Sequence, residues 1–252
     1  MVDTKLDIVI LTGAGISKES GLDTFRDEGG IWSQVNIEDV ATPNAYQKNP
    51  KRVQEFYNSR RRPLIEGHIK PNAAHDALAR LEKDWILKNK GRVTIVTQNI
   101  DNLHEIAGSK NLIHMHGEIL KSRCQKCGSI LICNTDLGFS EACSDCSEKS
   151  SLRPHVVWFG EEPLEMDRIY TLLQECALFI SVGTSGNVYP AAGFIKIVRE
   201  NLNIYTIELN LEPSEGATLF DEARYGVATE IIPIYVEELL LNGIPSKSIN
   251  IN

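Results

Sequence analysis

Two pairs of cysteines have the spacing of a metal site. Cys124 and Cys127 form one Cys-x-x-Cys pair, and Cys143 and Cys146 form a second pair after 15 intervening residues. Each pair can present two thiolates to one ion, and this spacing is typical of a zinc ribbon. Because four cysteines leave no coordination position for water, the predicted zinc is structural and catalysis must lie elsewhere. Two unrelated redox or buried pairs are the alternative, and Cys133 is expected to be a packed thiol.

Two glycine-rich runs, each after a short apolar run, have the composition of phosphate-binding turns. The first consists of Gly13, Ala14, Gly15, Ile16 and Ser17, and the second begins with Gly183, Thr184 and Ser185. Glycines there let the backbone approach a pyrophosphate, whose charge a helix N-terminus favours. Lys18 stands where a dehydrogenase fingerprint requires a third glycine, so the first run favours a dinucleotide site but argues against hydride transfer. For the second run, an ordinary strand-to-helix turn is the alternative.

Apolar runs that alternate with helical patterns indicate the elements that must position these turns. Residues 7–11, 92–96, 178–182 and 203–207 predict buried parallel strands. Helical spacing is found over residues 74–85, 190–200 and 235–241. This alternation predicts an α/β fold with a Rossmann-like, doubly wound parallel sheet. The polar residues of Glu208-Leu209-Asn210 would end one strand, where side chains could meet ribose hydroxyls.

Two stretches interrupt the alternation and predict a smaller, inserted domain. Residues 31–69 are polar and helical, and residues 119–154 hold the cysteine pairs among turn-forming residues. We therefore expect one catalytic unit over residues 1–252. Its Rossmann-like part comprises 1–30, 70–118 and 155–252, and its small domain combines the helical insertion with the zinc ribbon.

The composition of the chain indicates which partners and which cellular compartment to expect. The formal net charge of −8 argues against a broad nucleic-acid surface and is compatible with basic peptide partners. No apolar run approaches the ~20 residues of a membrane span, and the first apolar stretch is too short for a signal peptide. Two cysteine pairs with two lone cysteines indicate a reducing compartment. We expect a cytoplasmic protein that binds neither nucleic acid nor membrane.

Six motifs taken together resemble the sirtuin family. They are the first glycine run, Gly21-Leu-Asp-Thr-Phe-Arg26, Thr97-Gln-Asn-Ile-Asp101, His114-Met-His-Gly117, the cysteine pairs and Gly183-Thr-Ser185. Their order and spacing agree from about residue 7 to residue 240. One departure is Asp23, where many sirtuins carry proline, but it leaves Phe25 and Arg26 in place.

The resemblance implies an NAD-dependent protein-lysine deacylase whose substrates are acyl-lysine proteins or peptides. Sirtuins cleave the nicotinamide–ribose bond of NAD, join the acyl oxygen to the ribose carbon, and release nicotinamide and O-acyl-ADP-ribose. By resemblance His116 is the general base that activates a ribose hydroxyl, and the other catalytic residues, Asn99 and Asp101, line the nicotinamide and ribose pocket, where Asp101 would accept hydrogen bonds from the carboxamide. An unperturbed histidine pKa of about 6.5 suits a base at neutral pH. The alternatives are a structural histidine and, for Asp101, a helix N-cap.

Further contacts to NAD and to the peptide are implied along the chain. Besides the two glycine runs, the cofactor residues are Phe25, Arg26, Trp32, Gln98, Asn99, Ile100, Asp101, Asn210, Leu211, Glu212 and Ala228. Residues 156–161 resemble the strand that pairs with the substrate backbone. The peptide is therefore expected to bind by strand addition to Val157, Phe159, Gly160 and Glu161.

Three residues of the helical insertion resemble the branch of sirtuins that removes succinyl and malonyl groups. Tyr57 and Arg60 share one face of a helix and offer a hydroxyl and a guanidinium to a distal carboxylate, while Ala41 leaves room for a longer chain. The alternative is that Arg60 belongs to a solvated basic run with Arg61 and Arg62. Two other functions compete with deacylation: mono-ADP-ribosyl transfer to an acceptor side chain, and a zinc-ribbon interaction module without catalysis.

Overall fold

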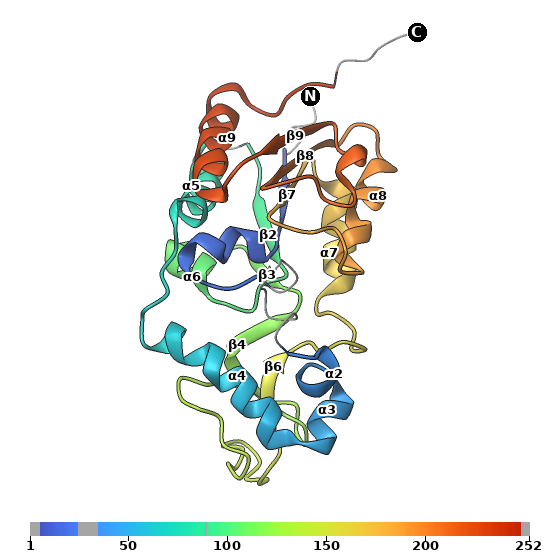
Figure 1. Cartoon of the computed structure of the whole chain (residues 1–252). Helices are drawn as coiled ribbons and strands as arrows, with labels where there is room; N and C mark the ends of the chain where they lie inside the picture. Colours follow the sequence, from blue (N-terminus) through green and yellow to red (C-terminus); the bar gives the residue numbers. More distant parts are fainter. Residues whose placement is uncertain (1–5, 25–34, 89, 248–252) are drawn as a thin grey trace.

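The larger part of the molecule is built on one six-stranded parallel sheet (Figure 1). The structure is a computed structural model that describes residues 6–24, 35–88 and 90–247. The strands are β1 (Ile8–Thr12), β2 (Val93–Thr97), β3 (Leu112–His114), β7 (Leu178–Val182), β8 (Tyr205–Asn210) and β9 (Glu222–Tyr225). Their order is β3-β2-β1-β7-β8-β9, and every neighbouring pair is parallel. The strand order reverses between β1 and β7, the point at which doubly wound folds bind their ligands. The predicted Rossmann-like fold is confirmed.

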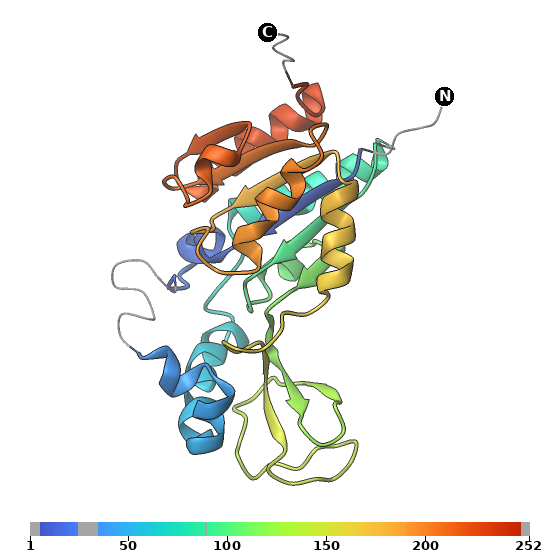
Figure 2. The same ribbon diagram turned by 90° about the vertical axis from the view of Figure 1, so that its right-hand side faces the viewer.

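Helices cover both faces of this sheet because its central strands are apolar on both sides. Ile8 and Ile10 of β1 join the core under α5 (Ala73–Leu87) and α9 (Ala228–Asn242), and Val9 and Leu11 join the core under α7 (Met166–Glu175) and α8 (Phe194–Arg199). A short helix, α6 (Leu103–Ala107), packs against α5. Figures 1 and 2 show the resulting three layers.

The smaller part combines an antiparallel sheet with helices and lies below the large sheet in Figure 2. Its strands are β5 (Ile130–Ile132), β4 (Gly117–Cys124) and β6 (Leu152–Val156), in that order. Its helices are α2 (Ile37–Val40), α3 (Pro43–Lys48) and α4 (Pro50–Ile65). Asn36, Thr42 and Asn49 cap these helices, because each side chain accepts a backbone N–H two or three residues further on. The domain limits given above remain a prediction.

Several elements differ from the sequence prediction at their ends. Most of the first glycine run is itself part of a 3-10 helix, η1 (Ala14–Ser20), and the helix expected over 190–200 is divided into η2 (Ala191–Gly193) and α8. A further 3-10 turn, η3 (Ala217–Leu219), precedes β9. Helix α9 begins well before the predicted residue 235. The prediction missed its first turns because Pro233, in the second turn, is a residue that usually ends a helix. No described helix has the length and apolar character needed to cross a membrane.

Candidate active site

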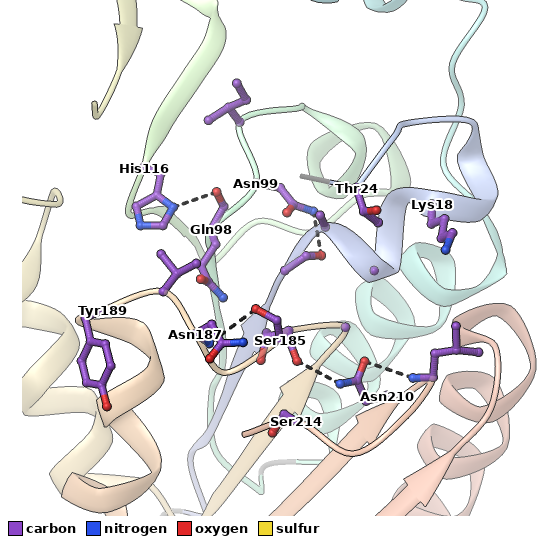
Figure 3. A pocket seen from close by; sticks show the side chains of 18 of the residues that line it. Lys18, Thr24, Gln98, Asn99, His116, Ser185, Asn187, Tyr189, Asn210 and Ser214 are labelled. Atoms are coloured by element: carbon purple, nitrogen blue, oxygen red, sulfur yellow. Dashed lines mark hydrogen bonds between the residues drawn. The ribbon is translucent and has the colours of Figure 1, made fainter. Parts of the chain in front are cut away.

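A cleft of about 720 Å³ opens at the carboxyl ends of β1 and β7 and reaches the small part (Figure 3). Its volume is that of a cofactor site, for which ~300–1,000 Å³ is usual. The predicted cofactor residues that line it are Gly13, Ala14, Gly15, Gln98, Asn99, Ile100, Gly183, Thr184, Ser185, Asn210, Leu211, Glu212 and Ala228. The other predicted residues on its walls are His116, Ala41, Tyr57, Arg60, Val157, Phe159, Gly160 and Glu161. Phe25, Arg26 and Trp32 lie outside the described residues.

The two glycine runs touch each other on one wall of the cleft. The Gly13 N–H donates to the Val182 carbonyl at 2.9 Å, and the Gly15 N–H donates to the Gly183 carbonyl at 3.0 Å. A Cβ added to Gly15 would lie 2.7 Å from the Gly183 Cα, and one added to Gly183 would lie 2.6 Å from the Ile16 nitrogen. Gly183 also has a φ of 59°, which favours glycine. This close approach leaves a wall of backbone without side chains, which suits a pyrophosphate and therefore NAD.

Three predicted residues, Ile16, Ser17 and Asp101, are buried behind this wall and do not line the cleft. The Ser17 hydroxyl donates to Asp101 Oδ2 at 3.1 Å and accepts from Asn99 Nδ2 at 3.2 Å. Asn99 Nδ2 also donates to the Gly13 carbonyl at 3.1 Å. The Asp101 side chain accepts from the Leu103 N–H at 3.0 Å, one residue before the N-cap position of α6, which is Asn102, and burial raises the pKa of Asp101. These bonds hold the Asn99 loop against the first glycine run.

The two ring nitrogens of His116 differ in their hydrogen bonds. Its Nδ1 lies 3.0 Å from the Gln98 carbonyl, which can only accept, so Nδ1 carries the proton, and Nε2, which bonds no residue that the structure describes, keeps its lone pair. Burial lowers the pKa of His116, against the opposing effect of the Gln98 carbonyl, so the ring is neutral at pH 7. His114 instead places Nε2 2.7 Å from Glu105 and Nδ1 3.3 Å from the Asn99 carbonyl. Two histidines separated by one residue therefore have different surroundings, and of the two only His116 lines the cleft.

Helix α4 brings Arg60 and Tyr57 to the far end of the cleft. Arg60 Nη1 donates to the Phe56 carbonyl at 2.9 Å, and its guanidinium carbon lies 3.6 Å from the centre of the Phe56 ring. Its Nε is buried without a hydrogen-bond partner, and among the described residues no carboxylate forms an ion pair with it. Burial lowers the pKa of Arg60 and raises that of Tyr57. A cation in this setting is prepared for an anionic ligand.

The other two arginines of the run have different surroundings. Arg61 is fully buried, donates from Nε to the Ile119 carbonyl at 2.8 Å, and bonds Asn58 through Nη1. Arg62 is exposed and binds both carboxylate oxygens of Asp136. The three consecutive arginines thus do not form one solvated basic patch.

The expected peptide-binding strand over residues 156–161 is shorter than predicted. Strand β6 ends at Val156. The next backbone donors are used within the chain, since the Val157 N–H donates to the His116 carbonyl and the Phe159 N–H to the Ala41 carbonyl, both at 2.9 Å.

An ion pair between Arg153 and Glu161 accompanies a turn of the backbone in this segment. Glu161 accepts two bonds from the Arg153 guanidinium, at 2.6 and 2.9 Å, and one from the Trp158 N–H at 2.8 Å. Arg153 also stacks on the Trp158 ring, 3.3 Å from its centre, and Gly160 has a φ of 89°. A strand cannot continue through this turn, so the peptide-binding role of these residues remains a prediction.

The four paired cysteines come together as expected for one metal ion. The Sγ atoms of Cys124, Cys127, Cys143 and Cys146 all lie within 4.8 Å of one another. Cys124 Sγ is 3.7 Å from Cys146 Sγ, and Cys127 Sγ is 3.7 Å from Cys143 Sγ. A tetrahedral zinc with Zn–S bonds of about 2.3 Å separates its sulfurs by about 3.8 Å, so the donors fit a structural zinc. Cys133 is buried in the apolar cluster beside them.

Further residues of the cleft were not predicted from the sequence. Figure 3 labels Lys18, Thr24, Asn187, Tyr189 and Ser214 among them. Asn187 directly follows the second glycine run, which was a signal for it. Lys18 likewise follows the first glycine run, and Thr24 lies within the Gly21–Arg26 motif, whereas Tyr189 and Ser214 depend on how distant loops meet.

The end of strand β8 contributes differently from the prediction. Glu208 is buried and accepts from the Ser214 hydroxyl and, at 3.2 Å, from the Tyr225 hydroxyl, so it does not face the cleft. Asn210 does line the cleft and donates to the Thr184 carbonyl at 2.9 Å.

Comparisons with known proteins agree with this geometry. The chain matches the Sir2 family over residues 13–190. The NAD-dependent protein deacylase of Pasteurella multocida (strain Pm70) is 57% identical over 235 residues, which cover 92% of this chain and 97% of the relative. A Sir2 homologue variant in complex with ADP-ribose aligns with a TM-score of 0.84 at 32% identity, over 97% of each chain. A Sir2 structure with a p53 peptide and NAD+ aligns with a TM-score of 0.73 at 28% identity, over 94% of this chain and 92% of the other.

The names of these relatives describe deacylation and give no support to the mono-ADP-ribosyltransferase alternative. The family match covers more than half of the sequence, and the cleft joins the glycine runs, Asn99 and His116 at one place. The chain belongs to the Sir2 family.

Proposed function

We propose that this Sir2-family chain is an NAD-dependent protein-lysine deacylase that removes succinyl and malonyl groups as well as acetyl groups. Its products are nicotinamide and the O-acyl-ADP-ribose of the acyl group removed. The observation that carries the acyl preference is the Arg60 guanidinium, which lies on the cleft wall beside Tyr57 with a buried, unpartnered Nε.

His116 is placed to act as the base of the reaction. NAD supplies the ribose carbon that receives the acyl oxygen and the nicotinamide that leaves. The Gln98 carbonyl fixes the proton on Nδ1, so Nε2 can take a proton from a ribose hydroxyl. Asn99, fixed by the Gly13 carbonyl and Ser17, keeps the loop that carries Gln98 in place. The depressed pKa of His116 keeps this base unprotonated at neutral pH.

At the acyl end, the chain offers two donors and a small residue. The Arg60 guanidinium and the Tyr57 hydroxyl can bind the terminal carboxylate of a succinyl or malonyl group. Ala41, on the same cleft, has a methyl side chain and leaves room for the longer acyl chain. An acetyl group has no terminal carboxylate, so its removal does not use Arg60.

The test is mass spectrometry of acetyl-, malonyl- and succinyl-lysine peptides incubated with the protein and NAD. We expect free lysine from all three, with matched O-acyl-ADP-ribose and nicotinamide. Deacetylation without desuccinylation or demalonylation would reject the acyl preference. ADP-ribosylated protein with no freed lysine would reject deacylation itself.

A further inference from the structure

We propose that the zinc ribbon (residues 119–154) positions the acyl-recognition helix, and that Gln54 and Asn58 control acyl selectivity from outside the cleft. This inference rests on the proposed recognition of a distal carboxylate by Arg60. Both residues are positioning residues, since neither lines the cleft.

Helix α4 contacts the cleft with one face and the zinc ribbon with another. Phe56, Tyr57 and Arg60 line the cleft. At about 100° per residue, Gln54 and Asn58 share a different face, one turn apart. Both amides are buried, with exposed fractions of 2% and 5%. A buried amide on a helix must find partners, so this face is built for contact with another segment.

Both amides bond backbone groups of the zinc ribbon, in addition to the bond that Asn58 Oδ1 accepts from Arg61 Nη1 and the one that Gln54 Nε2 donates to the Tyr46 hydroxyl. Asn58 Nδ2 donates to the Leu137 carbonyl at 3.2 Å, and Asn58 Oδ1 accepts from the Leu137 N–H at 2.9 Å. Gln54 Nε2 donates to the Leu152 carbonyl at 3.1 Å. Gln54 and Asn58 of the helix therefore bind two separate segments of the ribbon.

The same two leucines form the core of the ribbon beside the predicted metal ligands. Leu137 and Leu152 pack in one apolar cluster with Cys124 and Cys143. The backbone of each leucine thus holds α4, while its side chain contacts the cysteines that zinc would fix. A continuous set of contacts connects the metal site with the helix that carries Arg60.

These contacts predict a selective effect. A carboxylate bond to Arg60 depends on distance and angle, and misplacement by about 1 Å is enough to weaken such contacts strongly. The groups at the reaction end, His116 and Asn99, come from the loops after the large sheet's strands, and their own side-chain bonds go to Gln98, Gly13 and Ser17, none of which is in α4. Loosening α4 should therefore impair succinyl binding and spare deacetylation.

The experiment uses the full-length, zinc-loaded protein and two variants. Asn58→Ala removes all contacts of that amide, and Gln54→Met is a milder change, because the Tyr46 hydroxyl also bonds the Leu152 carbonyl at 2.8 Å. We expect Asn58→Ala to raise KM for a succinyl-lysine peptide about threefold to tenfold, the size of lost ordinary hydrogen bonds, with little change in kcat. Gln54→Met should give a smaller rise. The constants for the acetyl-lysine peptide and the zinc content should stay unchanged in both.

Two controls separate positioning from loss of stability. Ile169→Val loosens the core under α7, far from α4 in sequence and in the fold, and should leave the ratio of desuccinylation to deacetylation unchanged. The second control needs no activity: removing zinc with a chelator should speed hydrogen exchange of the α4 amides and leave those of α7 protected.

Three outcomes would overturn the inference. In the first, Arg60→Met changes the acyl ratio but Asn58→Ala does not, and the proposed function then stands alone. In the second, both activities of Asn58→Ala fall in parallel, and the amide is only structural. In the third, zinc removal leaves exchange in α4 unaffected. If the wild-type protein shows no Arg60-dependent desuccinylation, the proposed function fails first and this inference with it.

Discussion

Replacing Arg60 with methionine removes the charge at the acyl end of the cleft with the least change in packing. The Arg60 guanidinium lies over the Phe56 ring, with its carbon 3.6 Å from the ring centre, and the unbranched methionine side chain can cover the same surface. Nη1 is already bonded to the Phe56 carbonyl and Nε is buried, so we expect a carboxylate to bind the remaining guanidinium donors.

The size of the effect follows from these donors. A hydrogen bond to a charged group contributes about 1.5–3 kcal/mol, so kcat/KM for a succinyl-lysine peptide should fall about tenfold to a hundredfold. Deacetylation should change by less than about twofold, since an acetyl group does not reach the guanidinium. Tyr57→Phe removes one neutral donor and should cost about threefold to tenfold on the succinyl peptide.

The assay compares kcat/KM for succinyl- and acetyl-lysine versions of one peptide at saturating NAD. Equal losses on both peptides would mean that Arg60 only supports the fold of α4. No loss on either would mean that Arg60 takes no part in acyl recognition.

Four other results are expected. His116→Ala should lower deacylation about 10²- to 10⁴-fold while calorimetry still detects NAD binding, and near-normal turnover by this variant would remove the histidine from the mechanism. Wild-type activity should fall on acidification only below about pH 6.5, because the base is active when neutral and its pKa is depressed. Metal analysis should find one zinc per chain, unchanged by Cys133→Ser, and a zinc-free protein with an intact fold would contradict the ribbon. Gly183→Ala should weaken NAD binding and lower the melting temperature, because its Cβ would lie 2.6 Å from a backbone nitrogen; wild-type values for both would contradict the packing described. Burial lowers the pKa of His75 to about 4, so between about pH 6.5 and 4 the unfolded chain binds a proton that the folded chain does not. The free energy of unfolding should therefore fall on acidification in this range by up to ~1.4 kcal/mol per pH unit. If urea unfolding of a His75→Gln variant gave the same slope of stability against pH, His75 would not be its cause.

Local spacing allowed the sheet, the zinc cysteines and the glycine runs to be predicted from the sequence. A Cys-x-x-Cys turn and a strand that ends in glycine carry their geometry within a few residues, so Cys124 and Gly13 need no knowledge of distant segments. The short edge strands β3 and β9 were missed. Each has only three or four residues, too few for a periodic pattern.

Tertiary contacts decided what the sequence did not reveal. Arg60, Arg61 and Arg62 are adjacent, yet a helix turns about 100° per residue and directs them to the cleft, the interior and an exposed ion pair. Similarly, the strand pattern around residue 158 is interrupted by the bond from Arg153 to Glu161, which no local rule predicts.

The contact between the two glycine runs has an evolutionary consequence. Gly15 and Gly183 are far apart in the sequence, yet a Cβ on either would meet the backbone of the other run at 2.6–2.7 Å. No single substitution at one position can be accommodated unless the opposite loop moves away at the same time. The two loops should therefore be inherited as a pair among related proteins. A chimera that exchanges one loop with a distant relative should fold well only when the second is exchanged with it.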